Sequence, residues 1–190
     1  MKKHILFTTI LSLLLLAVSA SAQTTPNFAG TWTLDVAKSR ISDREKAVIA
    51  FQSITAVQTG TDISVTTTTK RVPPPDAPKA ADGTPGGGAA PATGPFSNTF
   101  AFTFDGKETV ASAPGPNGKS MPVKTSSKWE GSKLVLTTSR THAPRDGGAE
   151  ITTVTKETWE LVGDGKTLII RRDQTTPEGT TTTARVYTKS

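Results

Sequence analysis

Glycine-containing turns divide this chain into about ten short segments in which apolar and polar residues alternate. Threonine fills much of the polar side of these segments. It supplies 34 of the 190 residues, and its β-branched side chain suits a pleated, half-exposed surface. We therefore predict an all-β fold, an antiparallel up-and-down β-barrel of about 8–10 strands in sequential order. Closure would remove the exposed sheet edges and leave an interior for a small ligand. An open sheet or a sandwich is the alternative, because hairpin order alone does not prove closure.

The first 22 residues carry the pattern of a secretory signal peptide. Two lysines precede an almost unbroken apolar run over residues 5–18, and Ala20-Ser-Ala22 supplies the small residues of a cleavage site. The run is too short to cross a bilayer core, so we expect no transmembrane segment. The mature chain would then begin at Gln23, form a single domain over residues 23–190, and be secreted or periplasmic.

The segment over residues 39–52 breaks the alternation and predicts a short helix after the first strand. Ser42 would cap this helix, with Glu45 as its capping-box partner. Val48 and Phe51 are three residues apart and would pack together on one helical side. We expect the helix either to plug one end of the barrel or to form a mobile ligand portal.

A second interruption covers residues 73–95, where 18 of 23 residues are Pro, Gly or Ala. Such a segment cannot bury enough apolar surface to offset its ordering entropy, so we expect a disordered inserted loop. The alternative is a cell-wall tether or a segment that docks an envelope protein partner.

Residues 96–104 alternate cleanly, and three aromatic residues share one face: Phe100, Phe102 and Phe104. We expect these three to line a cavity, although a dry core would favour the same pattern. The Asp105-Gly106 pair that follows predicts a hairpin with the next strand. The three tryptophans are expected in the core or at a barrel end: Trp32, Trp129 and Trp159.

The last two segments, residues 166–172 and 180–189, predict a hairpin about a turn at residues 177–179. Tight pairing joins residues whose numbers add up to about 355, which gives three pairs on one face: Leu168 with Tyr187, Ile170 with Arg185, and Arg172 with Thr183. Inside a barrel, this face would hold the anionic head of an apolar ligand through charge-assisted hydrogen bonds.

The opposite orientation of this hairpin is also open: Ile169, Ala184 and Val186 form an equally apolar inward face, and the basic face then points to solvent. Burial of an unpaired guanidinium is costly. An inward arginine therefore needs a ligand, an internal acid or water.

Four short motifs are considered as one set: Gly30-x-Trp32, Lys128-Trp-Glu-Gly131, Trp159 with Gly165-Lys166, and Arg185-Val-Tyr187. They resemble the calycin superfamily of lipocalins and fatty-acid-binding proteins, in the form of a bacterial exported member. The resemblance implies a lipocalin-like β-barrel that binds or transports a small apolar, acidic ligand. It also implies roles for individual residues. Arg185 and Tyr187 would hold a carboxylate, Arg172 would be a second carboxylate-facing arginine, and an arginine stacked on Trp32 would close the barrel.

The chain departs from that pattern, because only 13 residues separate Arg172 from Arg185 and long Pro/Gly insertions are present. Other classes of protein have less support. The mature chain has 20 basic and 16 acidic residues, a net charge of +4 spread along its length, so we expect no nucleic-acid partner. His142 is the only mature histidine, and no cysteine is present, so we expect no catalytic residue, no metal and no cofactor.

The predicted function is therefore non-enzymatic binding or transport of a small hydrophobic or amphipathic molecule by a monomer. The alternative is an envelope protein-interaction or inhibitor module on a solid barrel scaffold.

Overall fold

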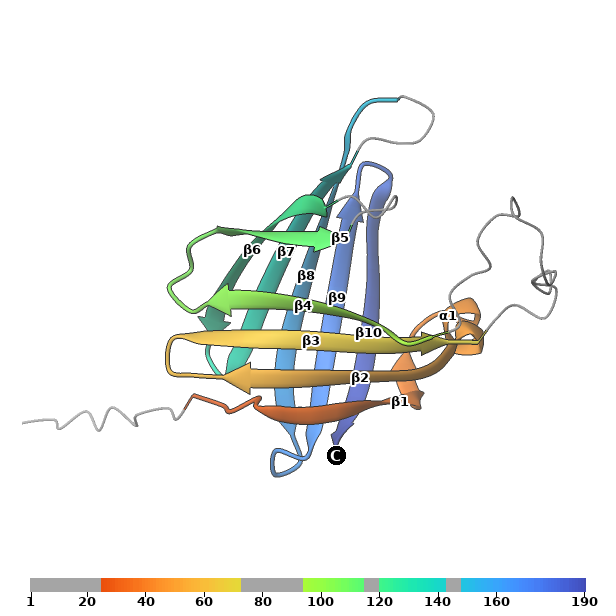
Figure 1. Cartoon of the computed structure of the whole chain (residues 1–190). Helices are drawn as coiled ribbons and strands as arrows, with labels where there is room; N and C mark the ends of the chain where they lie inside the picture. Colours follow the sequence, from red (N-terminus) through yellow and green to blue (C-terminus); the bar gives the residue numbers. More distant parts are fainter. Residues whose placement is uncertain (1–24, 73–93, 115–119, 143–147) are drawn as a thin grey trace, which may run out of the picture.

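The computed structural model describes residues 25–72, 94–114, 120–142 and 148–190. Within these ranges the chain forms ten strands and one short helix (Figure 1), with these bounds: β1 (Gly30–Arg40), α1 (Asp43–Val48), β2 (Ile49–Gln58), β3 (Asp62–Arg71), β4 (Phe96–Thr103), β5 (Thr109–Pro114), β6 (Ser120–Glu130), β7 (Lys133–His142), β8 (Ile151–Val162), β9 (Thr167–Thr176) and β10 (Gly179–Lys189). The expected signal peptide lies outside the described residues, and so does the expected loop at residues 73–95 except for its last two residues.

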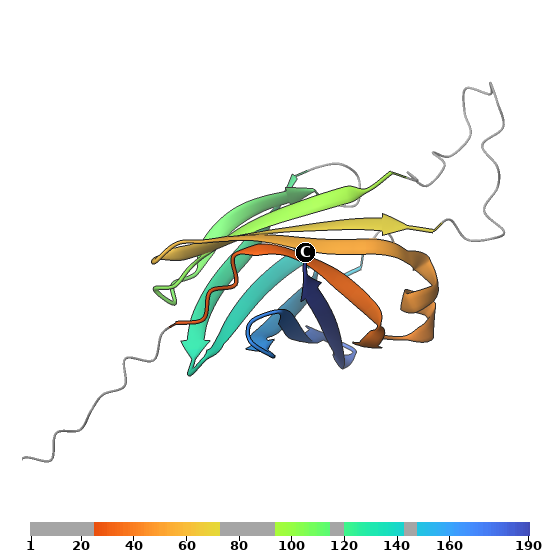
Figure 2. The ribbon, with the colours of Figure 1, turned by 90° about the horizontal axis from the view of Figure 1, so that it is seen from below.

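All ten strands belong to one antiparallel sheet in the order β4-β3-β2-β1-β10-β9-β8-β7-β6-β5. Neighbours in the sheet are therefore neighbours in the sequence, apart from the pairing of β1 with β10. Strands β1–β5 lie across β6–β10, so the sheet folds over on itself (Figures 1 and 2). The predicted all-β, up-and-down barrel with a short helix after its first strand is confirmed.

The barrel is nearly closed rather than fully closed, because β4 and β5 are the two free edges of the sheet. The hairpin predicted at Asp105-Gly106 is therefore wrong. The chain does turn there, with the Asp105 carboxylate accepting from Thr103 Oγ1 at 2.8 Å. However, the next strand begins only at Thr109 and pairs with β6.

Side chains of β6 bridge the gap between the two edges. Thr125 Oγ1 donates to the carbonyl of Ala101 at 3.2 Å, and Ser127 Oγ donates to the carbonyl of Thr103 at 2.8 Å. Both hydroxyl residues are almost fully buried. Side-chain hydroxyls thus satisfy carbonyls on the edge of β4, where a backbone ladder would otherwise do so.

Aromatic and aliphatic side chains fill one end of the barrel, as the alternation predicts. Trp32 and Trp159 are fully buried there, and Phe28 packs edge-on against Trp159 with ring centroids 5.8 Å apart. The indole nitrogen of Trp32 donates to the carbonyl of Phe28 at 2.8 Å. The cation over the Trp32 ring is Lys189, with Nζ 5.1 Å from the centroid, and not the arginine implied by the resemblance to lipocalins.

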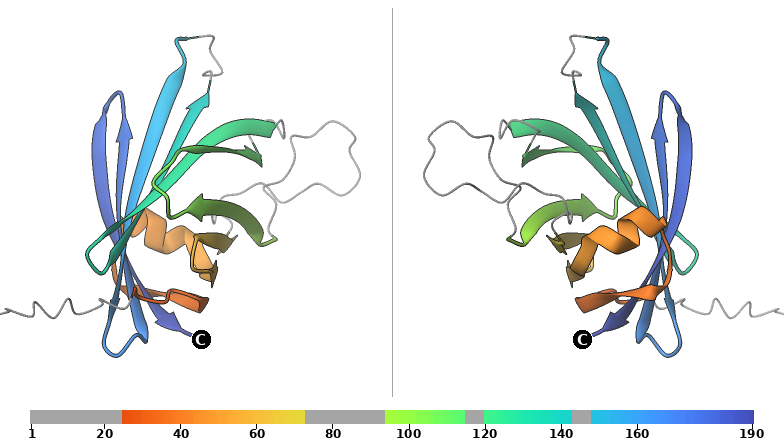
Figure 3. Two further views of the ribbon diagram at one scale, coloured as in Figure 1. Left: turned by 90° about the vertical axis from the view of Figure 1, so that its left-hand side faces the viewer. Right: turned by 90° about the vertical axis from the view of Figure 1, so that its right-hand side faces the viewer.

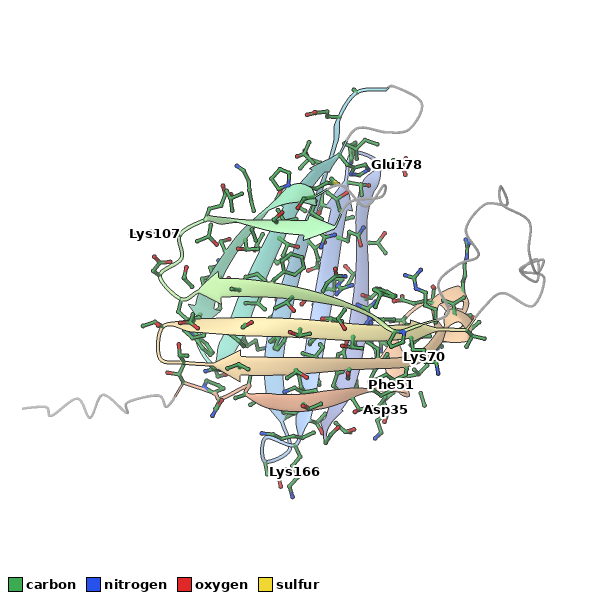
Figure 4. All side chains as sticks on the ribbon, in the orientation of Figure 1. Asp35, Phe51, Lys70, Lys107, Lys166 and Glu178 are labelled. Atoms are coloured by element: carbon green, nitrogen blue, oxygen red, sulfur yellow. The ribbon has the colours of Figure 1, made fainter. Side chains whose placement is uncertain are left out.

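Helix α1 lies across one end of the barrel, as the right-hand view of Figure 3 shows. Its predicted cap is present, because Ser42 Oγ accepts from Glu45 N at 3.1 Å. The expected packing of Val48 against Phe51 is wrong. The helix ends at Val48, and Phe51 lies on β2, opposite Lys70 of β3, with 44% of its surface exposed (Figure 4). No helix in the described part of the chain is long and apolar enough to span a membrane.

Candidate ligand-binding site

The last hairpin has the predicted register. Strands β9 and β10 pair Leu168 with Tyr187, Ile170 with Arg185, and Arg172 with Thr183. Arg185 and Tyr187 are only 5% and 2% exposed, and Arg185 lines a cavity inside the barrel. The basic face of this hairpin therefore points inward, and the solvent-facing alternative is wrong.

The cavity has a volume of about 700 Å³ and lies between α1 and the packed end of the barrel. Its walls come from both halves of the sheet. Its apolar lining includes Val65, Phe100, Phe102, Val123 and Leu136. Arg172 and Arg185 lie on the β9–β10 side, so one cavity brings together apolar walls and cationic groups.

Two of the three phenylalanines predicted to line a cavity do so: Phe100 and Phe102. Phe104 lies at the packed end instead, where its ring meets Trp129 with centroids 5.4 Å apart. From Phe100 to Phe104 the strand advances about 13 Å, so one face of β4 runs from the cavity into the core.

Arg172 is held by an acid that the sequence prediction did not include. Its Nε and Nη2 donate to Glu157 Oε1 at 2.8 and 2.5 Å, and the indole nitrogen of Trp159 donates to Glu157 Oε2 at 3.1 Å. Burial raises the pKa of Glu157, but the charge of Arg172 and these hydrogen bonds outweigh burial, so this pKa lies below its ordinary value. Burial lowers the pKa of Arg172, and Glu157 more than offsets it. This pair stays ionised.

Arg185 is held by the helix. Its Nη2 donates to Oε1 of Glu45, a helix residue that lies 140 positions earlier in the chain. Just before this helix, the pairing of β1 with β10 is irregular between Asp35 and Arg40. There Ser39 Oγ donates to the carbonyl of Asp35 at 2.7 Å and accepts from Val186 N of β10 at 3.0 Å.

The remaining donors of Arg185 are unsatisfied. Nε and Nη1 are both buried, and neither has a hydrogen-bond partner among the described residues. A buried donor without an acceptor costs about 1–3 kcal/mol. An acceptor that enters the cavity and reaches these atoms would recover that free energy.

Tyr187, the third predicted head-group residue, does not line the cavity. Its hydroxyl donates to Gln52 Oε1 at 2.9 Å, and Gln52 itself lines the cavity. Burial raises the pKa of Tyr187 above its ordinary value, so the phenol stays neutral. Tyr187 therefore holds a cavity-lining residue, Gln52, in place.

The cavity residues that were not assigned to the site from the sequence include three basic side chains: Arg71, Arg140 and His142. The Arg140 guanidinium lies over the Phe100 ring, 5.1 Å from its centroid, and Arg71 lies over Phe96 at 5.3 Å. All three follow the inward alternation of β3 or β7. This alternation is the sequence signal that would have placed them in the cavity.

Ten antiparallel strands in a nearly closed barrel, with a short helix after the first strand, fit the calycin and lipocalin-like architecture that the sequence resembles. No family model matches the chain, and no curated protein does. Among solved structures, the chain is similar to the zebrafish ileal bile acid-binding protein complexed with cholic acid. The two chains are 19% identical, with a TM-score of 0.45, and the match covers 86% of this chain and 98% of that protein.

Proposed function

We propose that this protein binds and carries a small apolar molecule with an acidic head, in the periplasm or outside the cell. The observation that carries the proposal is Arg185: a nearly fully buried guanidinium that lines the cavity and has two donors without an acceptor among the described residues. A carboxylate is the natural partner for such a group, because its planar fork matches the carboxylate oxygens.

The rest of the cavity supports an amphipathic ligand. A volume of about 700 Å³ falls within the range of sites for small molecules. Phe100, Phe102 and Leu136 supply apolar surface against which a hydrocarbon body would lie, away from the charged β9–β10 side. Head and body would then occupy different walls of one cavity.

The test compares binding of a long-chain fatty acid and its methyl ester to the wild-type protein, to Arg185→Gln and to Arg171→Gln. Arg171 lies on the same hairpin but is exposed and paired with Asp173, so it is a matched control for charge. We expect Arg185→Gln to weaken the acid about 10- to 100-fold, because it removes charge-assisted hydrogen bonds. The methyl ester should bind equally weakly to all three proteins.

Circular dichroism of each variant would establish that the barrel is intact. An acid affinity that does not change in Arg185→Gln would overturn the head-group role. Absence of binding to the wild-type protein would overturn the carrier proposal.

A further inference from the structure

The described lining of the cavity carries more positive than negative charge. Four arginines line it, from β3, β7, β9 and β10: Arg71, Arg140, Arg172 and Arg185. Two acids line it, and both are engaged, Glu157 with Arg172 and Glu45 with Arg185. One acidic ligand at Arg185 would therefore leave a second cationic position in the same cavity without a counter-charge.

Arg140 is that second position. It lies on β7 opposite Thr153 of β8, and its guanidinium reaches Phe100 of β4, 5.1 Å from the ring centroid. Strands β7 and β4 are not neighbours in the sheet, so this contact crosses the barrel interior. The Phe100 ring holds the guanidinium in place over an apolar wall of the cavity.

A ring face attracts a cation but supplies no counter-charge. Among the described residues, no acid forms an ion pair with Arg140. Burial lowers the pKa of Arg140, and the positive charge of Arg172 lowers it further. Both effects would be relieved by an anion that enters the cavity next to Arg140.

We propose that the ligand has a second acidic group, which binds Arg140 while the first binds Arg185. The ligand class is then an amphipathic diacid, with two carboxylates joined by an apolar body. This inference rests on the proposed function and names its ligand more narrowly. Arg71, stacked on Phe96, places a further cation among the residues that line the same cavity.

The test uses a series of saturated α,ω-dicarboxylic acids and the monomethyl ester of each. A diacid and its monoester have the same chain and differ by one charge. Affinities are measured by calorimetry for the wild-type protein, Arg140→Gln, Arg140→Lys, Arg185→Gln and the exposed control Arg171→Gln. We expect the best diacid to bind the wild-type protein at least about tenfold more tightly than its monoester.

Arg140→Gln should abolish this preference by weakening the diacid at least about tenfold more than the monoester, while Arg140→Lys should retain part of it. Equal affinities of diacid and monoester for the wild-type protein would overturn the second acidic group and leave the proposed function intact. A preference that survives in Arg140→Gln would overturn the role of Arg140. Monoester binding lost in Arg140→Gln but not in Arg185→Gln would show a single head group, at Arg140. Failure of every acid to bind the wild-type protein would overturn the proposed function itself.

Discussion

Glu45 accepts a hydrogen bond from Nη2 of Arg185, an atom that an incoming carboxylate would also use. A guanidinium offers two bidentate edges, and Nη2 belongs to both of them. Arg172 illustrates one of these edges, with Nε and Nη2 directed at the same Glu157 oxygen. Nη2 carries two N–H groups, one on each edge. Since Nη2 of Arg185 donates to Glu45, a ligand that binds Arg185 bidentately either displaces this carboxylate or binds beside its negative charge.

Removal of this internal competitor should therefore tighten binding. We expect Glu45→Gln to raise the affinity for a fatty acid about 3- to 30-fold, and to lower the free energy of unfolding by about 1–3 kcal/mol, because Arg185 loses its counter-charge. Calorimetry and urea unfolding measure the two effects. Asp43→Asn is the matched control, since Asp43 lies on the same helix with an exposed side chain. An unchanged or weaker affinity in Glu45→Gln would contradict the competition.

The ion pair of Glu157 predicts how stability depends on pH. Its pKa is lower in the folded protein than the ordinary 4.5, so its contribution is complete above that value and is lost as the pH falls through the folded pKa. We expect the free energy of unfolding to decline below about pH 4.5. In Glu157→Gln the decline should be shallower, and stability at pH 7 should be lower by about 1–3 kcal/mol, because Arg172 is left unpaired but partly exposed.

The measurement is urea unfolding of both proteins between pH 7 and pH 3. Glu178→Gln, on the exposed final turn, is the control and should keep the slope of the wild-type protein (Figure 4). Parallel pH profiles for the wild-type protein and Glu157→Gln would contradict the assignment of this loss of stability to Glu157.

Element by element, the strands were predictable from alternation and turns, because both are local properties. The tight turn after β9 sets the register of the last hairpin, and the four-residue turn at residues 163–166 likewise places Glu157 opposite Arg172. A turn read from the two glycines at 163 and 165 is one residue shorter and would place Lys156 there instead. The turn at Asp105 misleads this reasoning, since a local turn does not require its flanking strands to pair. What closes the barrel there is a contact between β6 and β4, which sequence pattern does not encode.

That contact should contribute measurable stability. Ser127→Ala removes the hydrogen bond to the Thr103 carbonyl, a partly buried acceptor, so we expect the free energy of unfolding to fall by about 1–2 kcal/mol. In Ser127→Ala, the amide hydrogens of β4 should also exchange faster than in the wild-type protein, because this strand is an edge of the sheet. The control is Thr66→Ala, whose hydroxyl bonds to Thr99 on the exposed face of β3 and β4. Equal losses of stability in the two variants would contradict a role of the Ser127 hydrogen bond in closing the gap between β4 and β5.

At the scale of the whole molecule, the composition of the site depends on contacts between segments far apart in the sequence. Local register predicts which residues share a face with Arg185, but the inward direction of that face became known only from the structure. The partner of Arg185 was not predicted either, since Glu45 comes from α1, 140 residues earlier in the chain. The sequence thus predicted the cations of the cavity better than the acids that neutralise them.

The barrel divides into a packed end and a cavity end, and this division predicts that stability and binding can be changed separately. Leu134 is fully buried opposite Trp159, so Leu134→Ala should lower the free energy of unfolding by about 2–5 kcal/mol and leave affinity nearly unchanged. Phe100 lines the cavity and is only half-buried. Phe100→Ala should cost less stability but weaken binding of a fatty acid about tenfold, because the apolar body of the ligand loses its wall. Urea unfolding and calorimetry on both variants measure the two quantities. A barrel that acts as one cooperative core without a binding end would instead lose stability and affinity in parallel.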